Sequence, residues 1–221
     1  MQTVVQEPEV ATAVVLRVTG EGERDLIVTG PRTRGRYHPA RPSTVCVRVP
    51  LLPGQARAVL GVSASDLVDR AVRLTDLWGE AGRRLTGDVA AAGDPGAVLA
   101  AALAGPGGDP ALTVAMRALA ESAPIDEAAG RAGVSERYLR TLFAREVGLS
   151  PKHFARISRV RRVLAMAGRE RWATVAARAG YFDQAHMIGD FRRLMGVTPG
   201  AYLSGRLPPV TPCLSLRGPA G

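Results

Sequence analysis

The second half of this 221-residue chain contains an internal duplication, and the repeat constrains the fold more than any other feature. Arg131-Ala132-Gly133 recurs as Arg178-Ala179-Gly180, 47 positions later. Beyond these glycines the offset is 48, and it relates Ser135, Leu139, Phe143, Gly148, Pro151 and Phe154 to Asp183, Met187, Phe191, Gly196, Pro199 and Tyr202. Because the one extra residue falls in a turn, both copies should form the same supersecondary unit.

Each copy predicts two helices joined by a tight turn. A short alanine-rich helix (125–132 and 173–179) ends at a glycine, and an N-cap residue, Ser135 or Asp183, then opens a second helix. This order is typical of a helix-turn-helix, although a generic helical hairpin would read the same way in one copy. Two copies in register favour DNA binding.

The charge of the chain is unevenly distributed. Residues 1–110 hold 12 arginines and 12 acidic residues, whereas residues 111–204 hold 14 arginines and Lys152 against 8 acidic residues. The net charge of +9 therefore belongs to the C-terminal half. A polyanion such as nucleic acid is the partner that this asymmetry favours, although a solvated basic surface would give the same pattern.

A long helix is predicted between the two copies, from Pro151 to Ala167, with Phe154, Ile157, Val160 and Leu164 on one side. At 1.5 Å per residue it is about 25 Å long. With the widths of the units added, this length separates them by roughly one duplex turn of about 34 Å. One chain could then contact two successive major grooves.

The stretch from Leu112 to Leu203 resembles the DNA-binding domain of the AraC/XylS family of transcription regulators. The resemblance rests on Ala177 to Met187, Phe191 to Arg193 and Gly196 to Pro199 with Tyr202, and in the first copy on Gly133 to Phe143 and Gly148 to Pro151. It implies seven helices, two helix-turn-helix units, a linker helix, and binding to promoter DNA that activates or represses transcription.

Eight polar side chains on the two second helices are the candidate DNA contacts. They are Glu136, Arg137, Arg140, Thr141 and Arg145 in the first unit, and Gln184, Arg192 and Arg193 in the second. Arg137 and Arg140 suit base readout, because a guanidinium can bond O6 and N7 of guanine together, with about 1 to 3 kcal/mol of discrimination. The resemblance implies a polar residue and an arginine where this chain has Ile188 and Gly189. We therefore expect the first unit to specify sequence and the second mainly to bind phosphate.

The first 104 residues predict a small β region followed by helices. Strands are expected at Thr12–Thr19, Leu26–Thr29 and Thr44–Leu51. Thr75 should then cap a helix whose apolar stripe is Leu77, Trp78, Ala81, Leu85 and Val89, and Asp94-Pro95 should open another. The stripe is a candidate dimer surface, and packing of the stripe on the sheet is the alternative.

Three segments of this region, Gly30–Thr33, Leu52–Val62 and Leu74–Gly79, resemble the latter part of the cupin-like domains that precede some AraC/XylS regulators. The predicted fold class is therefore α+β. We expect a partial cupin-like sensory or oligomerisation domain (1–104), a linker (105–110), an AraC-type DNA-binding domain (111–204) and a flexible tail (205–221). The linker prediction rests on the glycine- and proline-rich segment Ala104 to Pro110.

The functional prediction is a sequence-specific, non-enzymatic transcription regulator that binds double-stranded DNA. RNA polymerase, a second copy joined through the N-terminal domain, and an effector of unknown identity are candidate partners. The alternative is an interaction protein that pairs with another regulator and binds DNA weakly. A third class, a DNA-modifying enzyme, would need a reactive cysteine, and Cys46 is a weak candidate.

The sequence also disfavours several other classes of protein, among them enzymes, metalloproteins and membrane proteins. It contains no HExxH motif, phosphate loop or GxSxG motif, so we expect no catalytic residues, no cofactor and no metal. Cys46 and Cys213 form no CxxC pair, and no apolar run approaches the roughly 20 residues of a spanning helix. The first 30 residues carry Glu7, Glu9, Glu21 and Glu23 rather than a secretion signal. We expect a cytoplasmic protein that does not enter membranes.

Overall fold

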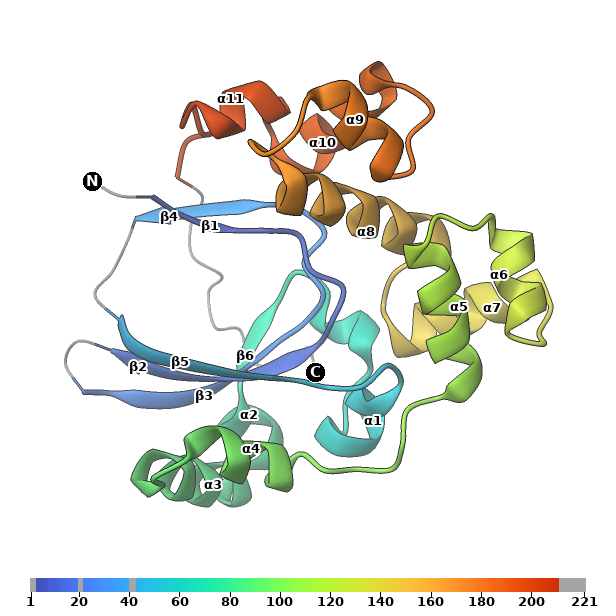
Figure 1. Ribbon diagram of the computed structural model, residues 1–221. Helices are drawn as coiled ribbons and strands as arrows, with labels where there is room; N and C mark the ends of the chain where they lie inside the picture. Colours follow the sequence, from blue (N-terminus) through green and yellow to red (C-terminus); the bar gives the residue numbers. More distant parts are fainter. Residues whose placement is uncertain (1–2, 20–21, 40–42, 211–221) are drawn as a thin grey trace.

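The computed structural model describes residues 3–19, 22–39 and 43–210, and it shows a β-rich N-terminal part and an all-helical C-terminal part (Figure 1). This architecture confirms the α+β fold class. The strands are β1 (Thr3–Gln6), β2 (Ala13–Thr19), β3 (Arg24–Thr29), β4 (Arg36–Pro39), β5 (Ser43–Pro50) and β6 (Ala71–Arg73). The helices of the N-terminal part are α1 (Gln55–Leu60), the 3-10 helix η1 (Ala64–Leu67), α2 (Leu74–Trp78), α3 (Glu80–Ala91) and α4 (Pro95–Ala102).

Residues 110–203, all of them described, form seven helices, the number that the family resemblance implies. They are α5 (Pro110–Ala120), α6 (Ile125–Arg131), α7 (Glu136–Glu146), α8 (Pro151–Met166), α9 (Trp172–Arg178), α10 (Gln184–Met195) and α11 (Pro199–Leu203). The side chain of Cys46, Cys213, and residues 211–221 of the predicted tail lie outside the described residues.

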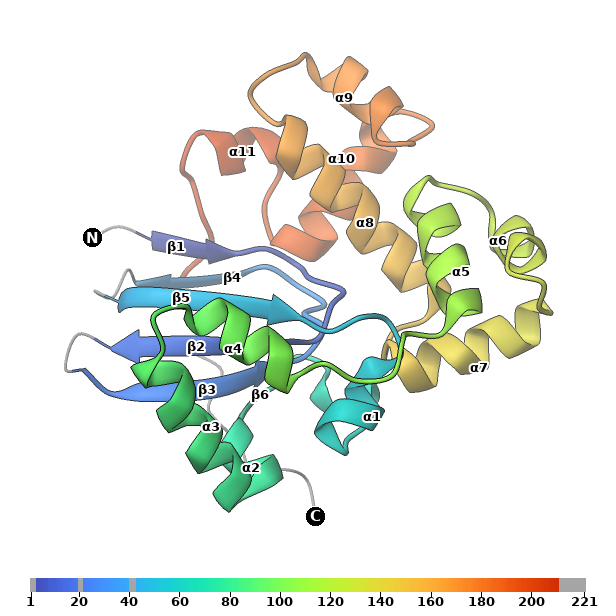
Figure 2. The same ribbon diagram turned by 60° about the horizontal axis from the view of Figure 1, so that its bottom comes forward.

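A four-stranded antiparallel sheet, in the order β5-β2-β3-β6, forms the centre of the N-terminal part. Val14 pairs with Val28 on one side and Val49 on the other, so these valines share one face. That face packs against helices α2 to α4 (Figure 2), and its core includes the fully buried Leu74 and Leu99. The three predicted strands correspond to β2, β3 and β5, and β6 was not predicted.

A second sheet contains only β1 and β4, and neither strand was predicted from the sequence. The pairing places Val5 opposite Tyr37 on the face that packs against the C-terminal helices. The buried Tyr37 hydroxyl donates a hydrogen bond to the carbonyl of Met195 in α10, at 2.6 Å. Burial raises the pKa of Tyr37 to about 12, so the hydroxyl keeps its proton at neutral pH.

The prediction of one helix capped by Thr75 is wrong in two respects. The chain breaks at Gly79 (φ 55°) into α2 and α3, and Thr75 lies inside α2 without acting as its cap. Val89 is buried, while Leu77, Trp78 and Leu85 pack against the core of the N-terminal part. This packing is the alternative reading of the stripe, and it leaves little apolar area for the candidate dimer surface.

The two predicted cap-then-proline starts are confirmed. The Asp94 carboxylate accepts a hydrogen bond from the Ala97 N–H, and that of Asp109 accepts one from the Leu112 N–H, both at 3.0 Å. Between α4 and α5 the chain is held against the N-terminal part, because the Gln55 side chain donates to the Pro106 carbonyl at 2.8 Å. A domain boundary in this segment stays a prediction.

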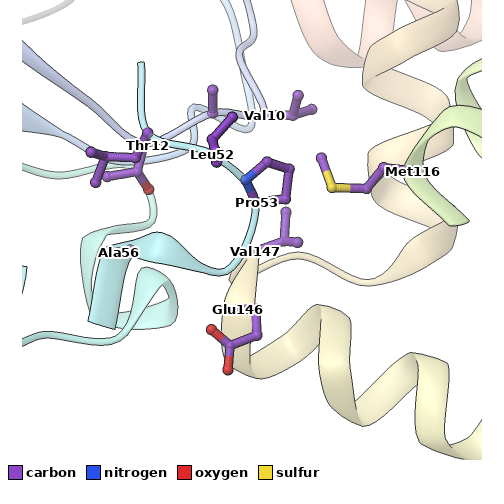
Figure 3. A pocket seen from close by; sticks show the side chains of 10 residues that line it. Val10, Thr12, Leu52, Pro53, Ala56, Met116, Glu146 and Val147 are labelled. Atoms are coloured by element: carbon purple, nitrogen blue, oxygen red, sulfur yellow. The ribbon is translucent and has the colours of Figure 1, made fainter. Parts of the chain in front are cut away.

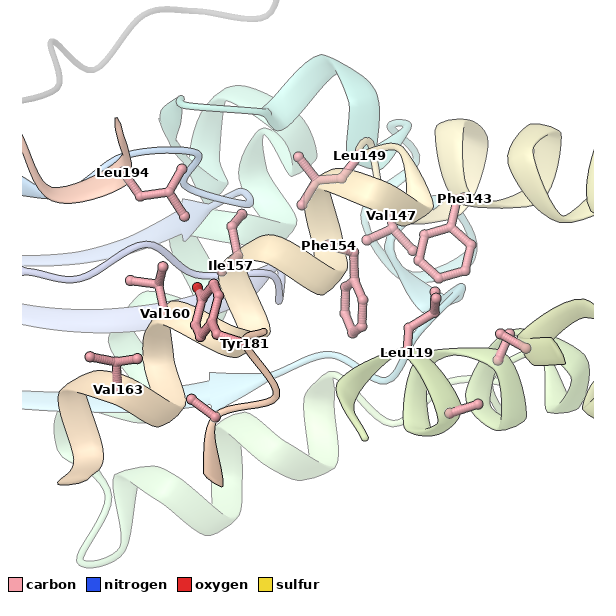
Figure 4. Close-up of a cluster of buried hydrophobic side chains, with 14 of the residues drawn as sticks. Leu119, Phe143, Val147, Leu149, Phe154, Ile157, Val160, Val163, Tyr181 and Leu194 are labelled. Atoms are coloured by element: carbon pink, nitrogen blue, oxygen red, sulfur yellow. The ribbon is translucent and has the colours of Figure 1, made fainter. Parts of the chain in front are cut away.

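The C-terminal helices pack around α8, whose Ile157, Val160 and Val163 are fully buried (Figure 4). Phe154 of α8 meets Phe143 of α7 edge to face, with ring centroids 5.5 Å apart. Tyr181, which precedes α10, enters the same core. Helix α8 therefore serves as the common support of both halves of the duplication, as the sequence predicts.

The N-terminal and C-terminal parts also enclose a small cavity of about 110 Å³ (Figure 3). Its N-terminal wall includes Val10, Leu52 and Pro53, and its opposite wall includes Met116 of α5 and Val147, which follows α7. The Glu146 carboxylate at the end of α7 is its charged group. The lining of the cavity is therefore mainly apolar and includes the end of α7.

Candidate nucleic-acid interface

The first helix-turn-helix unit consists of α6, a turn at Gly133 and α7. The alanines Ala128 and Ala129 of α6 are buried, and their small side chains let α7 pack closely. The Ser135 hydroxyl caps α7 by accepting a hydrogen bond from the Tyr138 N–H, at 3.2 Å. Leu139, Leu142 and Phe143 point into the core as predicted. The opposite face of α7 is therefore directed to solvent.

The candidate contacts of α7 lie on that outer face. Arg137, Arg140, Thr141 and Arg145 are exposed, and Glu136 is half-buried. Glu136 accepts a hydrogen bond from Arg140 at 2.6 Å, and this pair must open or rotate for Arg140 to bond a base. The Thr141 hydroxyl donates to the Arg137 carbonyl at 3.1 Å, so only its lone pairs and methyl group remain for DNA.

Arg145 differs from the other candidates because it lies at the end of α7 that contacts the N-terminal part. Its guanidinium bonds Glu146 at 2.6 Å, and its backbone carbonyl accepts a hydrogen bond from Ser63, which precedes η1, at 3.0 Å. The N-terminal end of α7 makes no such contact with the described N-terminal residues. The accessible candidates therefore cluster in the first turns of α7, where a recognition helix meets base edges.

The second unit repeats this construction with α9 and α10. Gly180 adopts a φ of 79° in the turn, and a Cβ there would lie 2.3 Å from the Ser122 hydroxyl. The second unit therefore touches the connection between α5 and α6, where Ser122 lies, just before the first unit begins. The Asp183 carboxylate caps α10 by accepting the His186 N–H at 2.7 Å, and Met187 and Phe191 are buried as predicted.

The candidates of α10 are exposed, but they do not form one cluster. Gln184 occupies the first position of the helix, whereas Arg192 and Arg193 lie in its last turn. Between them the exposed residues are Ala185, His186 and Gly189, because Ile188 is half-buried against the core. The second unit therefore presents no arginine in the middle of its second helix, where the first presents Arg140.

A buried ion-pair network fixes α10 to α8, and the sequence reading did not predict it. Asp190 is 5% exposed, and its carboxylate lies 3.0 Å from Arg156 Nε and 3.5 Å from an Arg159 NH group. Arg159 also lies over the Tyr181 ring, 5.1 Å from its centroid. One sequence feature points to the burial of Asp190, which is its position directly before Phe191, a residue predicted to face the core.

Two other arginines of α8 also hold the structure together. Arg162 donates to Ser122, and burial lowers the pKa of Arg162. Arg161 pairs with Glu9, which also pairs with Arg48 of β5 at 3.3 Å. These side chains join α8 to the first unit and to the N-terminal part. Both are already bonded within the protein, although Arg161 is exposed.

Exposed aromatic side chains are the other feature that the sequence reading did not include among the candidates. Tyr138 in the first turn of α7 is 49% exposed, and Phe182, directly before the cap of α10, is 96% exposed. His186 packs edge to face on Tyr181, with ring centroids 5.2 Å apart. Two aromatic residues follow each other in this turn, and since Tyr181 points into the core, Phe182 could have been expected to be exposed.

Among the described residues, no three His, Cys, Asp or Glu side chains are arranged to hold a metal ion. Within the same ranges, no helix combines the length and the apolar character that a membrane span requires.

Comparisons with known proteins concern mainly the duplicated segment. A family model described as a helix-turn-helix domain matches residues 128–205. A search of curated proteins found no match. Among solved structures, the DNA-binding domain of the transcriptional factor AdpA, in complex with a target DNA, is 27% identical with a TM-score of 0.41, and the match covers 44% of this chain and 92% of that one.

Two further solved structures have TM-scores close to this one, at lower sequence identity. The C-terminal domain of AraT, a response regulator from Geobacillus stearothermophilus, is 22% identical with a TM-score of 0.42, over 48% of this chain and 93% of that one. ToxT from Vibrio cholerae, solved with a bound unsaturated fatty acid, is 8% identical with a TM-score of 0.42, over 91% of this chain and 90% of that one.

The family match spans α6 to α11 and therefore both units of the duplication. It confirms the resemblance proposed for this segment, whereas the cupin-like character of residues 1–104 stays a prediction. Residues 128–205 form a helix-turn-helix domain of the AraC type.

Proposed function

We propose that the chain is a transcription regulator that reads promoter DNA with both helix-turn-helix units, one in each of two successive major grooves. The observation that carries this proposal is the arrangement of α7 and α10. Both helices are capped at an exposed N-terminal end and supported from behind by the same helix, α8. A helix so placed can enter a groove without rearrangement of its core.

In the first unit, Arg137 and Arg140 are the proposed base readers, while Arg145 contacts phosphate. Arg140 is 60% exposed, and its ion pair with Glu136 is a surface pair of small stability. Opening that pair in exchange for a bidentate bond to guanine therefore costs little. In the second unit, Gln184 contacts a base edge, and Arg192 and Arg193 contact phosphate.

The test is a binding titration of the full chain against its selected duplex and against random DNA, at several salt concentrations. Affinity for both should fall steeply as salt rises, while the preference for the selected duplex is kept. Arg140→Ala should reduce that preference about tenfold to a hundredfold, because one bidentate pair gives about 1 to 3 kcal/mol of discrimination. Ile188→Ala should change it little, and equal losses from both variants would contradict the assignment.

A second candidate function is an interaction protein that pairs with another regulator and binds DNA weakly. The outer face of α10 favours it, because neither Ala185 nor Gly189 can hydrogen-bond a base through a side chain. Such a protein would show neither selectivity nor a steep dependence on salt in the titration. RNA polymerase, a second copy of the chain and an effector are further partners that we propose without assigning a surface.

A further inference from the structure

The second unit has an exposed aromatic side chain that its fold does not require. Phe182 is 96% exposed, and the six other exposed large hydrophobic residues of the described ranges are between 43% and 56% exposed. Val134 of the first unit corresponds to the buried Tyr181, because each donates its N–H to the carbonyl five residues earlier at 3.0 Å, and Phe182 is the one extra residue of the second turn. An equivalent turn therefore forms without an outward aromatic ring.

The turn around Phe182 is held on both sides, so that the ring cannot fold inward. On one side, Tyr181 is 6% exposed and lies between Arg159 and His186. On the other side, Asp183 is fixed by its capping bond to the His186 N–H. The chain bends at Phe182, and its ring is exposed while the neighbouring Tyr181 is buried. Phe182 is thus presented beside the N-terminal end of α10.

The adjoining surface of α10 is shallow and apolar. Ala185 is exposed, and a Cβ added at Gly189 would meet nothing within 4 Å. A flat object can therefore approach the helix backbone closely along Ala185 and Gly189. Ala185 and Gly189 offer no side chain for hydrogen-bond readout, whereas Gln184 and His186 on the same helix are exposed, and the apolar ring of Phe182 lies just before this surface.

The charge around this surface identifies its partner. Arg171, Arg178, Arg192 and Arg193 are exposed on α10 or on the residues that begin and end α9. Glu170 pairs with Arg178, and Asp183 caps α10, so the arginines here that no carboxylate of the described residues pairs with are Arg171, Arg192 and Arg193. An apolar centre with a cationic border fits a groove that is flanked by phosphates. In the major groove, the apolar group on a base edge is the C5-methyl of thymine.

We propose that Phe182 determines specificity in the second unit by packing against thymine C5-methyl groups. This inference rests on the proposed DNA-binding function and deepens it. The first unit would then read bases by hydrogen bonds from arginine, and the second by apolar contact, with phosphate contacts from Arg192 and Arg193. This adds apolar base readout to the expectation that the second unit mainly binds phosphate.

The experiment uses the full chain and a duplex that it selects from a random library. Thymines of the half-site protected by the second unit are replaced one at a time by deoxyuridine, which removes the methyl group and keeps every hydrogen-bonding group. At least one of these replacements should weaken binding about 3- to 5-fold, the effect of losing contact with one buried methyl group. In Phe182→Ala the same replacements should have no effect, and Phe182→Leu should retain part of it.

Val114→Ala is the control, because Val114 is also exposed but lies on α5, outside the two units. It should respond to deoxyuridine as the unchanged chain does. If Phe182→Ala and the unchanged chain lose equal affinity on deoxyuridine duplexes, or neither loses any, the inference is wrong while the DNA-binding function stands. If no selected duplex is bound above random DNA, the proposed function itself fails. If Phe182→Ala keeps the deoxyuridine response but loses self-association, the surface binds protein and the inference is again wrong.

Discussion

Asp190 shows how much of the second unit depends on a single side chain. Its carboxylate is buried between Arg156 and Arg159, which are themselves about one-fifth exposed. Asp190→Ala should lower the free energy of unfolding by about 2 to 4 kcal/mol, because two largely buried guanidinium groups would lose their anion. Urea denaturation measures this loss. The matched control is Glu80→Ala, which breaks an exposed pair with Arg83 and should cost less than about 1 kcal/mol. Equal losses would contradict the assignment of Asp190 to a buried network.

His153, in the first turn of α8, should make stability depend on pH. Burial lowers the pKa of its imidazole, and the nearby Arg156 lowers it further, while a hydrogen bond with the Thr33 backbone and the charge of Asp69 oppose the shift. The unfolded chain therefore binds a proton at a higher pH than the folded chain. Stability from this group is present above pH 6.5 and is lost as pH falls through the folded pKa. The urea midpoint should drop between pH 7 and 5.5 in the unchanged chain and drop less in His153→Gln; an equal drop in both would exclude His153 as the cause.

At the scale of elements, helix starts were predictable because their signals are local. The serine or aspartate before each second helix caps it, and so do the Asp-Pro pairs before α4 and α5. What could not be predicted depends on distant partners. Strands β1 and β4 have four residues each and pair only with each other, so nothing in either segment alone specifies a strand. Likewise, the pairing of Asp190 with Arg156 and Arg159 requires α8 and α10 to be in place.

Because a helix cap acts locally, the contribution of each cap can be tested by a single substitution. Ser135→Ala and Asp183→Ala should each lower the free energy of unfolding by about 1 kcal/mol, the usual value of a lost N-cap. Each should also weaken DNA binding, since the first turn that frays carries Arg137 or Gln184. Thr75→Ala is the control, because Thr75 was expected to cap a helix and does not. Thermal melting and the binding titration measure both effects, and a loss from Thr75→Ala as large as the other two would refute the cap assignments.

At the scale of the whole molecule, the N-terminal part holds the C-terminal ends of α7 and α10, the second helices of the two units. Near the end of α7, Ser63 donates to the Arg145 carbonyl, and at the end of α10, Gly35 donates its N–H to the Leu194 carbonyl at 2.7 Å. Tyr37 bonds the next carbonyl, that of Met195. Both C-terminal ends are thus held by one β-rich part, whereas the N-terminal ends of α7 and α10 make no hydrogen bond to the described residues of that part. We infer that this part sets the angle and distance between the two units.

Gly148, which follows α7, allows a direct test of this role. It has a φ of 73°, and a Cβ there would lie 2.7 Å from the backbone oxygen of Ala64 in η1. Gly148→Ala should therefore push the N-terminal part away from α7. Gly133→Ala is the matched control, because Gly133 has a φ of 69° and open space around it. This variant therefore has the backbone strain of about 1 to 2 kcal/mol without a steric clash.

Both variants should melt at lower temperature. Only Gly148→Ala should bring rapid proteolysis between Ala104 and Pro110 and a broader tolerance for the spacing of two half-sites, since the units would no longer be held at a fixed distance. If both variants keep the same spacing preference as the unchanged chain, α8 alone determines the distance between the reader helices.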